Sequence, residues 1–495
     1  MPLLSFGYIW PDNYEINLRW EILFNTHIAI FGNTGSGKSN TLAKLYTELF
    51  DLNYKNLISL NKSKFILLDF NGEYVGDDIL YKHKKVYNLK NQHIKNQESK
   101  YDKLNINNKY FWDVEMLSII FDATEQTQKP FLKRLIKRYY NLDDEFNNIT
   151  NNLEGYFKKA FKNVFLNPNP DSLNLFIRIC EKLEIPINNI SKWIVNSRYH
   201  SQSETFYSTK PIEGWNKYVK KPTEETIYFF NVDVKLIEKE VENIIIDQKL
   251  FENDIDSLEI AVYFQMIHDL SHNTIQYDHL APLLHRIEAR LNDLSQVIKL
   301  DNSNTLISEE TLGVINLKNV SQDLKLLIPL IIARVTYKQN KEINIKKDFI
   351  VNLIIDEAHN ILSNKSYRES EKWKDYRLEV FEEIIKERRK FNFYLTIASQ
   401  RPTDISPTII SQIHNYFIHR LVNDNDLKML NNTLSTLDEV SKENIPNLAP
   451  GQLICTGVSF KIPLIIQVKK LCKNKAPISE SASLEKIWNT NKETK

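Results

Sequence analysis

The residues best suited to chemistry form one glycine-rich segment near the start of this 495-residue chain, "GNTGSGKS" at 32–39. It fits the pattern G-x-x-x-x-G-K-[S/T], whose glycines let successive backbone N–H groups turn toward an anion, while a helix beginning there adds its positive end. We expect it to bind the phosphates of ATP or GTP, with Lys38 at the β- and γ-phosphates and Ser39 as a ligand of Mg²⁺. The expected nucleotide-binding residues are Gly32, Asn33, Thr34, Gly35, Ser36, Gly37, Lys38, Ser39 and Asn40.

A phosphate loop of this kind needs an acidic partner at the end of another strand. The segment "NLIIDEAHN" at 352–360 supplies one, because apolar residues lead directly to Asp356 and Glu357. We expect Asp356 to help hold Mg²⁺ and Glu357 to polarise the attacking water, so that the nucleotide is hydrolysed as well as bound. The alternative is a strand that ends in a solvated acidic turn.

The elements that must position these residues alternate between strand and helix. The phosphate loop follows the apolar run 27–31 and precedes the helical pattern of Leu42, Leu45, Tyr46 and Leu49. A buried strand is expected at 64–70, and strands alternate with helices again over 312–400. Between these parts the pattern is largely helical. We therefore expect an α/β fold: a parallel-sheet P-loop core that carries a largely helical insertion.

Composition excludes several classes of protein. The net charge is +1, so nucleic acid would have to be contacted by a local patch rather than by a basic protein as a whole. Three scattered cysteines make neither a disulfide framework nor a zinc site. Neither a signal peptide nor a run of eighteen apolar residues is visible, so we expect a cytoplasmic protein with no membrane partner.

Two other families of P-loop proteins do not fit this sequence. Asp356 to His359 spell DEAH, but in two-lobed superfamily 2 helicases this motif lies on the order of a hundred residues after the phosphate loop and a second lobe follows. Here more than 300 residues separate Lys38 from Asp356, and only 136 follow His359. An ABC ATPase is excluded because no LSGGQ-like segment precedes Asp356.

Five segments together resemble another family. They are "HIAIFGNTGSGKSNT", "LLDFNGEY", "FDATEQTQKPFLKRLI", "LIIDEAHN" and "IIKERRKFNFYLTIASQRPTDISPTIISQIHNYFIHRL". In order and content they are similar to the HerA helicase/translocase family of the HerA–FtsK superfamily, over about 1–140 and 308–470. The resemblance implies a RecA-like core, a homohexameric ring and an ATP site between subunits.

The resemblance also implies roles for individual residues. Arg389 falls at the position of an arginine that reaches the γ-phosphate of a neighbouring subunit; the neighbouring Arg388 is the other candidate, and a basic helix end is the alternative to both. Gln400 is expected to sense the γ-phosphate or hold the water, unless it only closes a strand end. Arg401 and Arg420 are further candidates for nucleotide or neighbour contacts. Asp69 and Glu73 lie at a strand end expected to face the nucleotide, where they either act directly or, more simply, form a local turn.

The expected domain plan follows from the same comparison, because archaeal members carry a β-barrel before the phosphate loop and this chain has about 25 residues there. We expect an N-terminal stub at 1–24, the first part of the core at 25–140, a helical insertion at 141–307, the second part of the core at 308–472 and a polar tail at 473–495. With the barrel reduced, the insertion is the candidate surface for ring assembly or partner docking.

Two further patterns are open to simpler explanations. His268 and His272 could share a helix face, but helix packing accounts for them better than a metal site. The basic face of 128–140 could line a DNA channel or be a solvated helix face.

Three functions remain as hypotheses. The first is a ring-forming ATPase that moves along double-stranded DNA with a separately encoded nuclease or NADase-type effector, in phage defence or DNA end processing. The second is an ATPase scaffold that gates a protein effector. A conjugative coupling ATPase is less favoured because no membrane anchor is visible.

Overall fold

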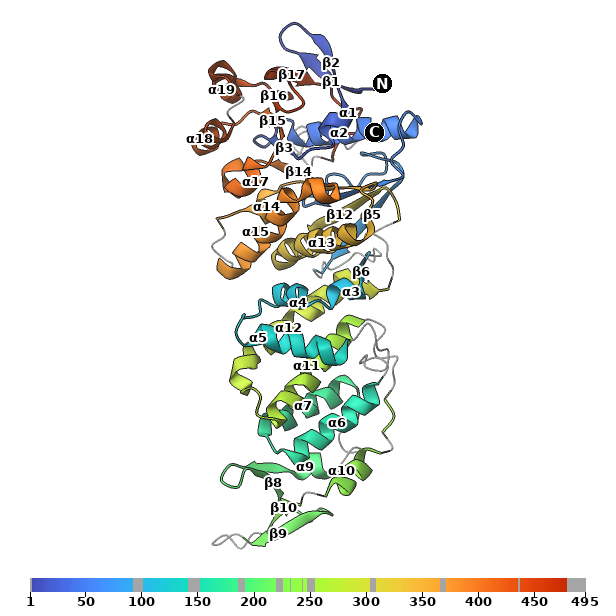
Figure 1. The fold of residues 1–495 in the computed structure, drawn as a ribbon, viewed down its shortest axis with the longest axis vertical. Helices are drawn as coiled ribbons and strands as arrows, with labels where there is room; N and C mark the ends of the chain where they lie inside the picture. The colour runs from blue at the N-terminus through green and yellow to red at the C-terminus, as the bar shows by residue number, and fades with distance from the viewer. Residues whose placement is uncertain are drawn as a thin grey trace, which may run out of the picture. The chain divides into compact units, whose positions relative to one another are not determined.

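The computed structural model describes residues 2–91, 101–140, 152–185, 192–219, 226–231, 233–242, 244–246, 254–302, 309–365, 371–434 and 437–478. The chain forms two compact units, one from residues 1–104 with 304–495 and one from residues 105–303 (Figure 1). Each is considered separately below.

The first unit is built on one mixed sheet, of which the described residues form eleven strands in the order β2-β1-β17-β16-β15-β3-β14-β13-β4-β12-β5. The strands are β1 (Leu4–Ile9), β2 (Tyr14–Leu18), β3 (Ile28–Phe31), β4 (Ser63–Asp69), β5 (Lys84–Lys90), β12 (Leu312–Asn319), β13 (Ile350–Ile355), β14 (Phe393–Ser399), β15 (Asn415–His419), β16 (Gln452–Gly457) and β17 (Leu464–Val468). From β15 to β5 all neighbours are parallel, whereas β16, β17, β1 and β2 extend the sheet antiparallel. The predicted α/β class with a parallel core is confirmed.

Strand composition explains which strands lie at the centre. Every residue of β3 and β14 is buried, as expected for parallel strands covered on both faces. The edge hairpin β1–β2 mixes buried, half-buried and exposed residues instead. In the segment expected to be an N-terminal stub, the described residues form this hairpin and the short helix α1 (Trp20–Leu23).

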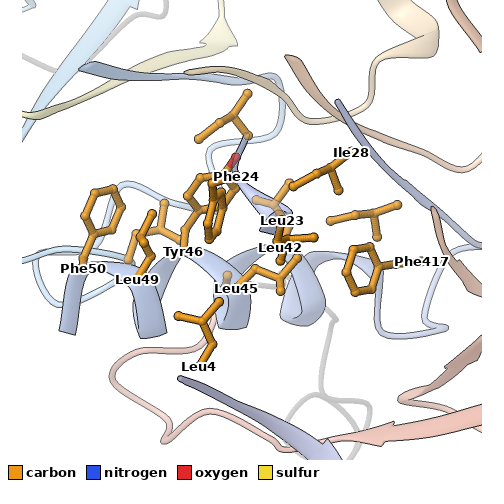
Figure 2. Close-up of a cluster of buried hydrophobic side chains, with 14 of the residues drawn as sticks. Leu4, Leu23, Phe24, Ile28, Leu42, Leu45, Tyr46, Leu49, Phe50 and Phe417 are labelled. Atoms are coloured by element: carbon orange, nitrogen blue, oxygen red, sulfur yellow. The ribbon is translucent and has the colours of Figure 1, made fainter. Parts of the chain in front are cut away.

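Helix α2 (Lys38–Tyr54) anchors the phosphate loop to the core of the unit. Its apolar positions Leu42, Leu45, Tyr46 and Leu49 are at most 1% exposed, which confirms the predicted periodicity. Figure 2 shows these side chains packed with Leu23, Ile28 and Phe417. The Tyr46 hydroxyl lies 2.7 Å from Thr396 Oγ1, which ties α2 to β14 through a buried hydrogen bond.

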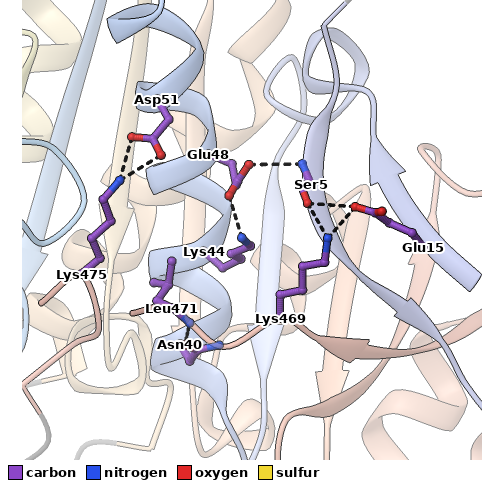
Figure 3. Close-up of polar contacts among 9 residues, drawn as sticks. All are labelled: Ser5, Glu15, Asn40, Lys44, Glu48, Asp51, Lys469, Leu471 and Lys475. Carbon is purple, nitrogen blue, oxygen red and sulfur yellow. Dashed lines mark hydrogen bonds and ion pairs between the residues drawn. The ribbon is translucent and has the colours of Figure 1, made fainter. Parts of the chain in front are cut away.

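Both ends of the described chain contact the exposed side of α2 (Figure 3). Glu48 accepts hydrogen bonds from Ser5 N at 3.3 Å and from Lys44 Nζ at 2.6 Å. Lys475 pairs with Asp51 at 3.0 Å, so part of the segment predicted as a polar tail lies against the core. These contacts fix the helix that presents the phosphate loop.

The remaining helices of the first unit follow the strands in the expected alternation. They are α13 (Gln322–Ile343), α14 (His359–Leu362), α15 (Glu371–Lys386), α16 (Arg388–Phe391), α17 (Pro407–Ser411), α18 (Asp424–Thr433) and α19 (Glu439–Asn444). Ser321 caps α13 by accepting from Leu324 N at 3.4 Å.

The second unit is largely helical. Its helices are α3 (Asn108–Phe111), α4 (Val114–Ile120), α5 (Gln128–Tyr139), α6 (Leu153–Leu166), α7 (Pro170–Lys182), α9 (Lys192–Asn196), α10 (Val234–Val241), α11 (Asp254–Ser271) and α12 (Tyr277–Val297). Two small sheets accompany them, β6 (Leu104–Asn107) with β11 (Ile298–Asp301), and an antiparallel sheet of β7 (Arg198–His200), β8 (Thr205–Ser208), β10 (Thr226–Phe230) and β9 (Trp215–Val219). These strands interrupt a region where the sequence pattern predicts a largely helical insertion.

The second unit also begins earlier than the boundary expected at residue 141. Helix α5 was assigned to the nucleotide-binding core, but its apolar face packs on α11 and α12. Gln128 donates to the carbonyl of His279 at 3.2 Å, and Arg286 of α12 donates to the carbonyl of Phe121 at 2.7 Å. These tertiary contacts place α3, α4 and α5 with the helical unit.

Candidate nucleotide site

The phosphate loop lies between β3 and α2, where the sequence pattern predicts it. Its tight turn is closed by Ser36, whose backbone N–H and hydroxyl both donate to the carbonyl of Asn33, at 3.1 and 2.7 Å. Gly37 has φ +110°, and a Cβ there would lie 3.0 Å from the Cα of Gly451. Only glycine meets both conditions without strain.

The acidic pair predicted from the sequence lies beside the loop lysine. Asp356 and Glu357 follow β13, which is separated from β3 by β14 alone. Lys38 Nζ lies 2.8 Å from Glu357 Oε1 and 3.9 Å from Asp356 Oδ1. The turn is held to β14 by a hydrogen bond from Ala358 N to the carbonyl of Ala398 at 2.8 Å. The structure therefore brings Lys38 together with an acidic pair that lies more than 300 residues away in the sequence.

Burial sets the protonation of this cluster. Burial raises the pKa of Asp356 to about 7, and the neighbouring Glu357 adds to that effect while Lys38 opposes it. Burial also opposes ionisation of Glu357, but His359 and Lys38 outweigh it and lower its pKa to about 2. The pKa of Lys38 is raised because its two acidic partners outweigh its own burial. Lys38 and Glu357 thus form a charged pair at neutral pH.

The carboxylate of Asp356 fits a metal ligand. The residue is 0% exposed, and neither carboxylate oxygen has a hydrogen-bond partner among the described residues. Buried carboxylate oxygens are normally hydrogen-bonded or bound to a cation, and Mg²⁺ prefers such oxygens. Asp356 would therefore suit the role of a Mg²⁺ ligand, and the predicted role of Ser39 as the second ligand stays a prediction.

Glu357 adopts an unusual backbone conformation, with φ +49°. A residue other than glycine in the left-handed region is strained, and such strain is concentrated at functional sites. The strain here aims the carboxylate at Lys38 on one side, while His359 Nδ1 lies 3.3 Å from its other oxygen.

Gln400 contacts the phosphate loop directly. It follows β14, the strand that pairs with both β3 and β13. Thr34 Oγ1 donates to Gln400 Oε1 at 2.6 Å. The strand order thus places Gln400 beside the phosphate loop and the strand that leads to Asp356, and its role in sensing nucleotide stays a prediction.

The two arginines proposed as trans-acting residues lie on α16. The side chains of Arg388 and Arg389 are outside the described part of the structure, so that prediction stays open. Arg401 is exposed. Arg420 donates through Nε to the carbonyl of Pro446 at 3.0 Å, and its own carbonyl accepts from Asn33 N at 2.9 Å. Arg420 therefore supports the loop through its backbone.

Asp69 organises a turn. Its carboxylate accepts from the backbone N–H groups of Gly72, Glu73 and Tyr74, at 2.7, 3.1 and 2.8 Å. Its contacts are thus those of local turn structure, the simpler of the two interpretations. Tyr74, which follows Glu73 in the quoted "GEY", had no predicted role. Its hydroxyl is fully buried without a hydrogen-bond partner among the described residues, and burial together with Asp356 raises the pKa of Tyr74 well above its usual value.

His419, which ends β15, was also missed. It is 0% exposed, with Nε2 2.9 Å from Thr41 Oγ1 and Nδ1 2.8 Å from the carbonyl of Gln452. Behind the loop, Gly451 N donates to the carbonyl of Ser36 at 2.8 Å. In the sequence, His419 in the quoted "YFIHRL" suggests only a strand end, because no neighbouring residue marks its partners.

The remaining sequence features have structural explanations. The rings of His268 and His272 stack at 4.2 Å on α11, and His272 Nδ1 lies 2.8 Å from the carbonyl of His268. Among the described residues, no group of three or more His, Cys, Asp or Glu side chains lies close enough together to hold a metal ion. Within the same residues, no helix has the length and apolar character needed to span a bilayer.

A phosphate loop joined to an acidic strand end across a central parallel sheet defines the class of P-loop nucleoside triphosphatases. Within this class the chain belongs to the family described as "Helicase HerA, central domain", whose sequence profile matches residues 5–336. The predicted family is confirmed.

Two curated relatives carry the HerA name. The chain is 31% identical over 195 residues to the "DNA double-strand break repair helicase HerA" of Sulfolobus acidocaldarius, covering 38% of each chain. It is 26% identical over 226 residues to the protein of the same name from Sulfurisphaera tokodaii, covering 44% of each. The chain thus spans about two fifths of the length of these curated relatives. Among solved structures, VirB4 of Thermoanaerobacter pseudethanolicus is 11% identical with a TM-score of 0.46, covering 95% of this chain and 97% of that one.

Proposed function

We propose that this chain hydrolyses ATP and uses the energy to move along double-stranded DNA, as a ring-forming HerA-type translocase. The observation that supports this best is the cluster of Lys38, Asp356 and Glu357, in which a loop lysine meets two carboxylates, and the oxygens of the buried Asp356 accept no hydrogen bond from the described residues. Membership of the HerA central-domain family supports the DNA substrate.

The residues divide the chemistry between them. The phosphate loop N–H groups and Lys38 bind the β- and γ-phosphates, which draws Lys38 away from Glu357. Glu357 is ionised in its pair with Lys38 and His359, and once Lys38 turns to the phosphates its carboxylate can accept a proton from water. Ser39 and Asp356 would hold Mg²⁺, and this cation would supply positive charge beside the phosphates. Gln400, already in contact with Thr34, is placed to orient the water or to report the γ-phosphate to the loop.

The assembly and partners belong to the same proposal. A homohexamer would place Arg389 of one subunit at the γ-phosphate bound by the next, where it stabilises transition-state charge. The partner in this proposal is a separately encoded nuclease or NADase-type effector. It would work with the ATPase in DNA end processing or phage defence.

The test is steady-state ATP hydrolysis with and without long double-stranded DNA. We expect DNA to stimulate turnover several-fold, and Glu357→Gln to lower kcat by about 10² or more while nucleotide stays bound. Glu443→Gln on exposed α19 is the matched control and should behave as wild type. Turnover that ignores DNA would refute the translocase and favour the effector-gating scaffold. An unchanged rate in Glu357→Gln would refute the assignment of the base.

A further inference from the structure

A hollow of about 420 Å³ opens between α5, α6 and α11, and all of its lining residues belong to the second unit. Four cations line it, and no described aspartate or glutamate does. These cations are Arg134, Lys137, Arg138 and Lys159. The hollow is therefore a concentrated positive site in a chain whose net charge is only +1.

A buried polar network holds the two arginines in place. Asp269, 1% exposed, accepts from Arg134 Nε at 3.1 Å and Nη2 at 2.8 Å. It also accepts from Gln265 Nε2 at 2.7 Å, and Gln265 Oε1 in turn accepts from Arg138 Nη1 at 3.1 Å. Gln265 is 0% exposed. Two guanidinium groups one helical turn apart are thus oriented from beneath, which lowers the entropy lost when they bind a ligand.

The positive charge of the hollow is mostly uncompensated. Asp269 balances one arginine, Arg134. Among described residues, no carboxylate pairs with Arg138, Lys137 or Lys159, and the two lysines are exposed. Three like charges with no acidic partner repel one another, so a polyanion bound there would relieve that repulsion.

The positive surface continues beyond this hollow. A second hollow, of about 690 Å³, shares Lys159 with the first and reaches α10. It adds Lys158, Lys162, Lys235 and Lys239, and two glutamates also line it: Glu238, which pairs with Lys162 at 2.8 Å, and Glu242. Lys235 and Lys239 lie one turn apart on α10, and neither pairs with a carboxylate among the described residues. We name the set Lys137, Arg138, Lys159, Lys235 and Lys239 the basic surface. Two adjoining hollows suit an extended polyanion better than a single small anion.

Aromatic side chains form the wall of the first hollow. Tyr156 is half-buried, and its ring lies 4.7 Å from that of Tyr139 and 6.3 Å from that of Phe264. Its hydroxyl donates to the carbonyl of Arg138 at 3.1 Å, which fixes the ring at the rim. Cations beside an aromatic face are the combination that binds the phosphates and the sugars or bases of nucleic acids.

We propose that the basic surface binds the phosphodiester backbone of a nucleic acid. Lys137, Arg138 and Lys159 neutralise phosphates, and Tyr156 packs against the sugar or base between them. The site lies wholly in the second unit and needs neither nucleotide nor hydrolysis, so it goes beyond the proposed function.

The test compares two full-length variants that each lose three positive charges from the second unit. The test variant is Lys137→Gln/Arg138→Gln/Lys159→Gln. The control is Lys133→Gln/Lys192→Gln/Lys299→Gln, whose residues are exposed and line neither hollow. Binding of a fluorescein-labelled DNA duplex is followed by anisotropy over a series of salt concentrations, without nucleotide.

We expect the test variant to bind the duplex at least tenfold more weakly at about 0.1 M salt, with a salt slope lower by about 2 to 3. The control should keep most of the wild-type slope. Equal affinity and slope in the two variants, or no duplex binding by wild type, would overturn the proposal. If the triple variant misfolds, Lys137→Gln/Lys159→Gln, which spares the buried network, should still lower the slope by about 2.

The outcome is independent of the motor. A test variant that loses DNA affinity while wild-type ATPase ignores DNA supports the basic surface and refutes translocation. DNA-stimulated ATPase with identical binding by test and control variants refutes the basic surface alone.

Discussion

Acidification should destabilise the first unit through one buried residue, His419. Its Nδ1 faces the carbonyl of Gln452, an acceptor, so Nδ1 carries the proton and Nε2 accepts from Thr41. This arrangement fixes the neutral imidazole. Burial lowers the pKa of His419 to about 4, with Lys38 contributing in the same direction.

The magnitude follows from linkage. In the unfolded chain the His419 pKa is about 6.5, so below that pH the unfolded state takes up a proton that the folded state refuses. Stability is therefore complete above pH 6.5 and is lost as the pH falls toward 4. The loss from this group is about 2 kcal/mol at pH 5 and approaches about 3 kcal/mol below pH 4.

The assay compares wild type with His419→Gln, which cannot titrate. Hydrogen exchange of α2 amides in increasing urea reports the free energy of unfolding of the first unit separately from the second. Other titrating groups are common to both proteins, so the wild-type advantage at pH 7.5 should shrink by about 2 kcal/mol at pH 5. An advantage that is constant over this range would refute a neutral, buried His419.

Three other consequences can be measured. Tyr74→Phe removes a buried hydroxyl without a described partner and should leave the unfolding free energy unchanged or raise it by about 1 kcal/mol, whereas a loss would show an overlooked partner. Gln400→Ala should lower kcat for ATP by about 10² with little change in nucleotide affinity, and a pure loss of affinity would contradict its role. Asp356→Asn/Glu357→Gln leaves Lys38 buried without a charged partner, which should lower the unfolding free energy of the nucleotide-free protein by about 3–5 kcal/mol, measured by urea unfolding. A urea midpoint equal to that of wild type would contradict the pairing.

Sequence patterns were informative where the structure is local. The phosphate loop, the apolar stripe of α2 and the acidic end of β13 each depend on residues adjacent in the chain or one helical turn apart. The placement of Gln400 also followed from the sequence, because β14 comes directly after β13 in the core and the two strands pair in parallel.

Other features depended on contacts between distant segments. Helix α5 has a periodicity equally suited to either unit, and only its packing on α11 and α12 assigns it to the second. The basic residues of α5 favoured a solvated face in the sequence, with a DNA channel as the alternative. The proposal of a binding surface depends on Asp269, more than 130 residues away, which holds Arg134 from beneath.

The sequence by itself determined the nucleotide-binding chemistry, because the backbone conformation of the loop and the ligand set require particular residue types at fixed spacing. The tertiary structure decided which side chains support that chemistry from behind. His419 and Gly451 reach the loop only because β15 pairs with β3 and β16 pairs with β15. Strand order is set by burial and pairing summed over the whole sheet, so no short segment of sequence contains it.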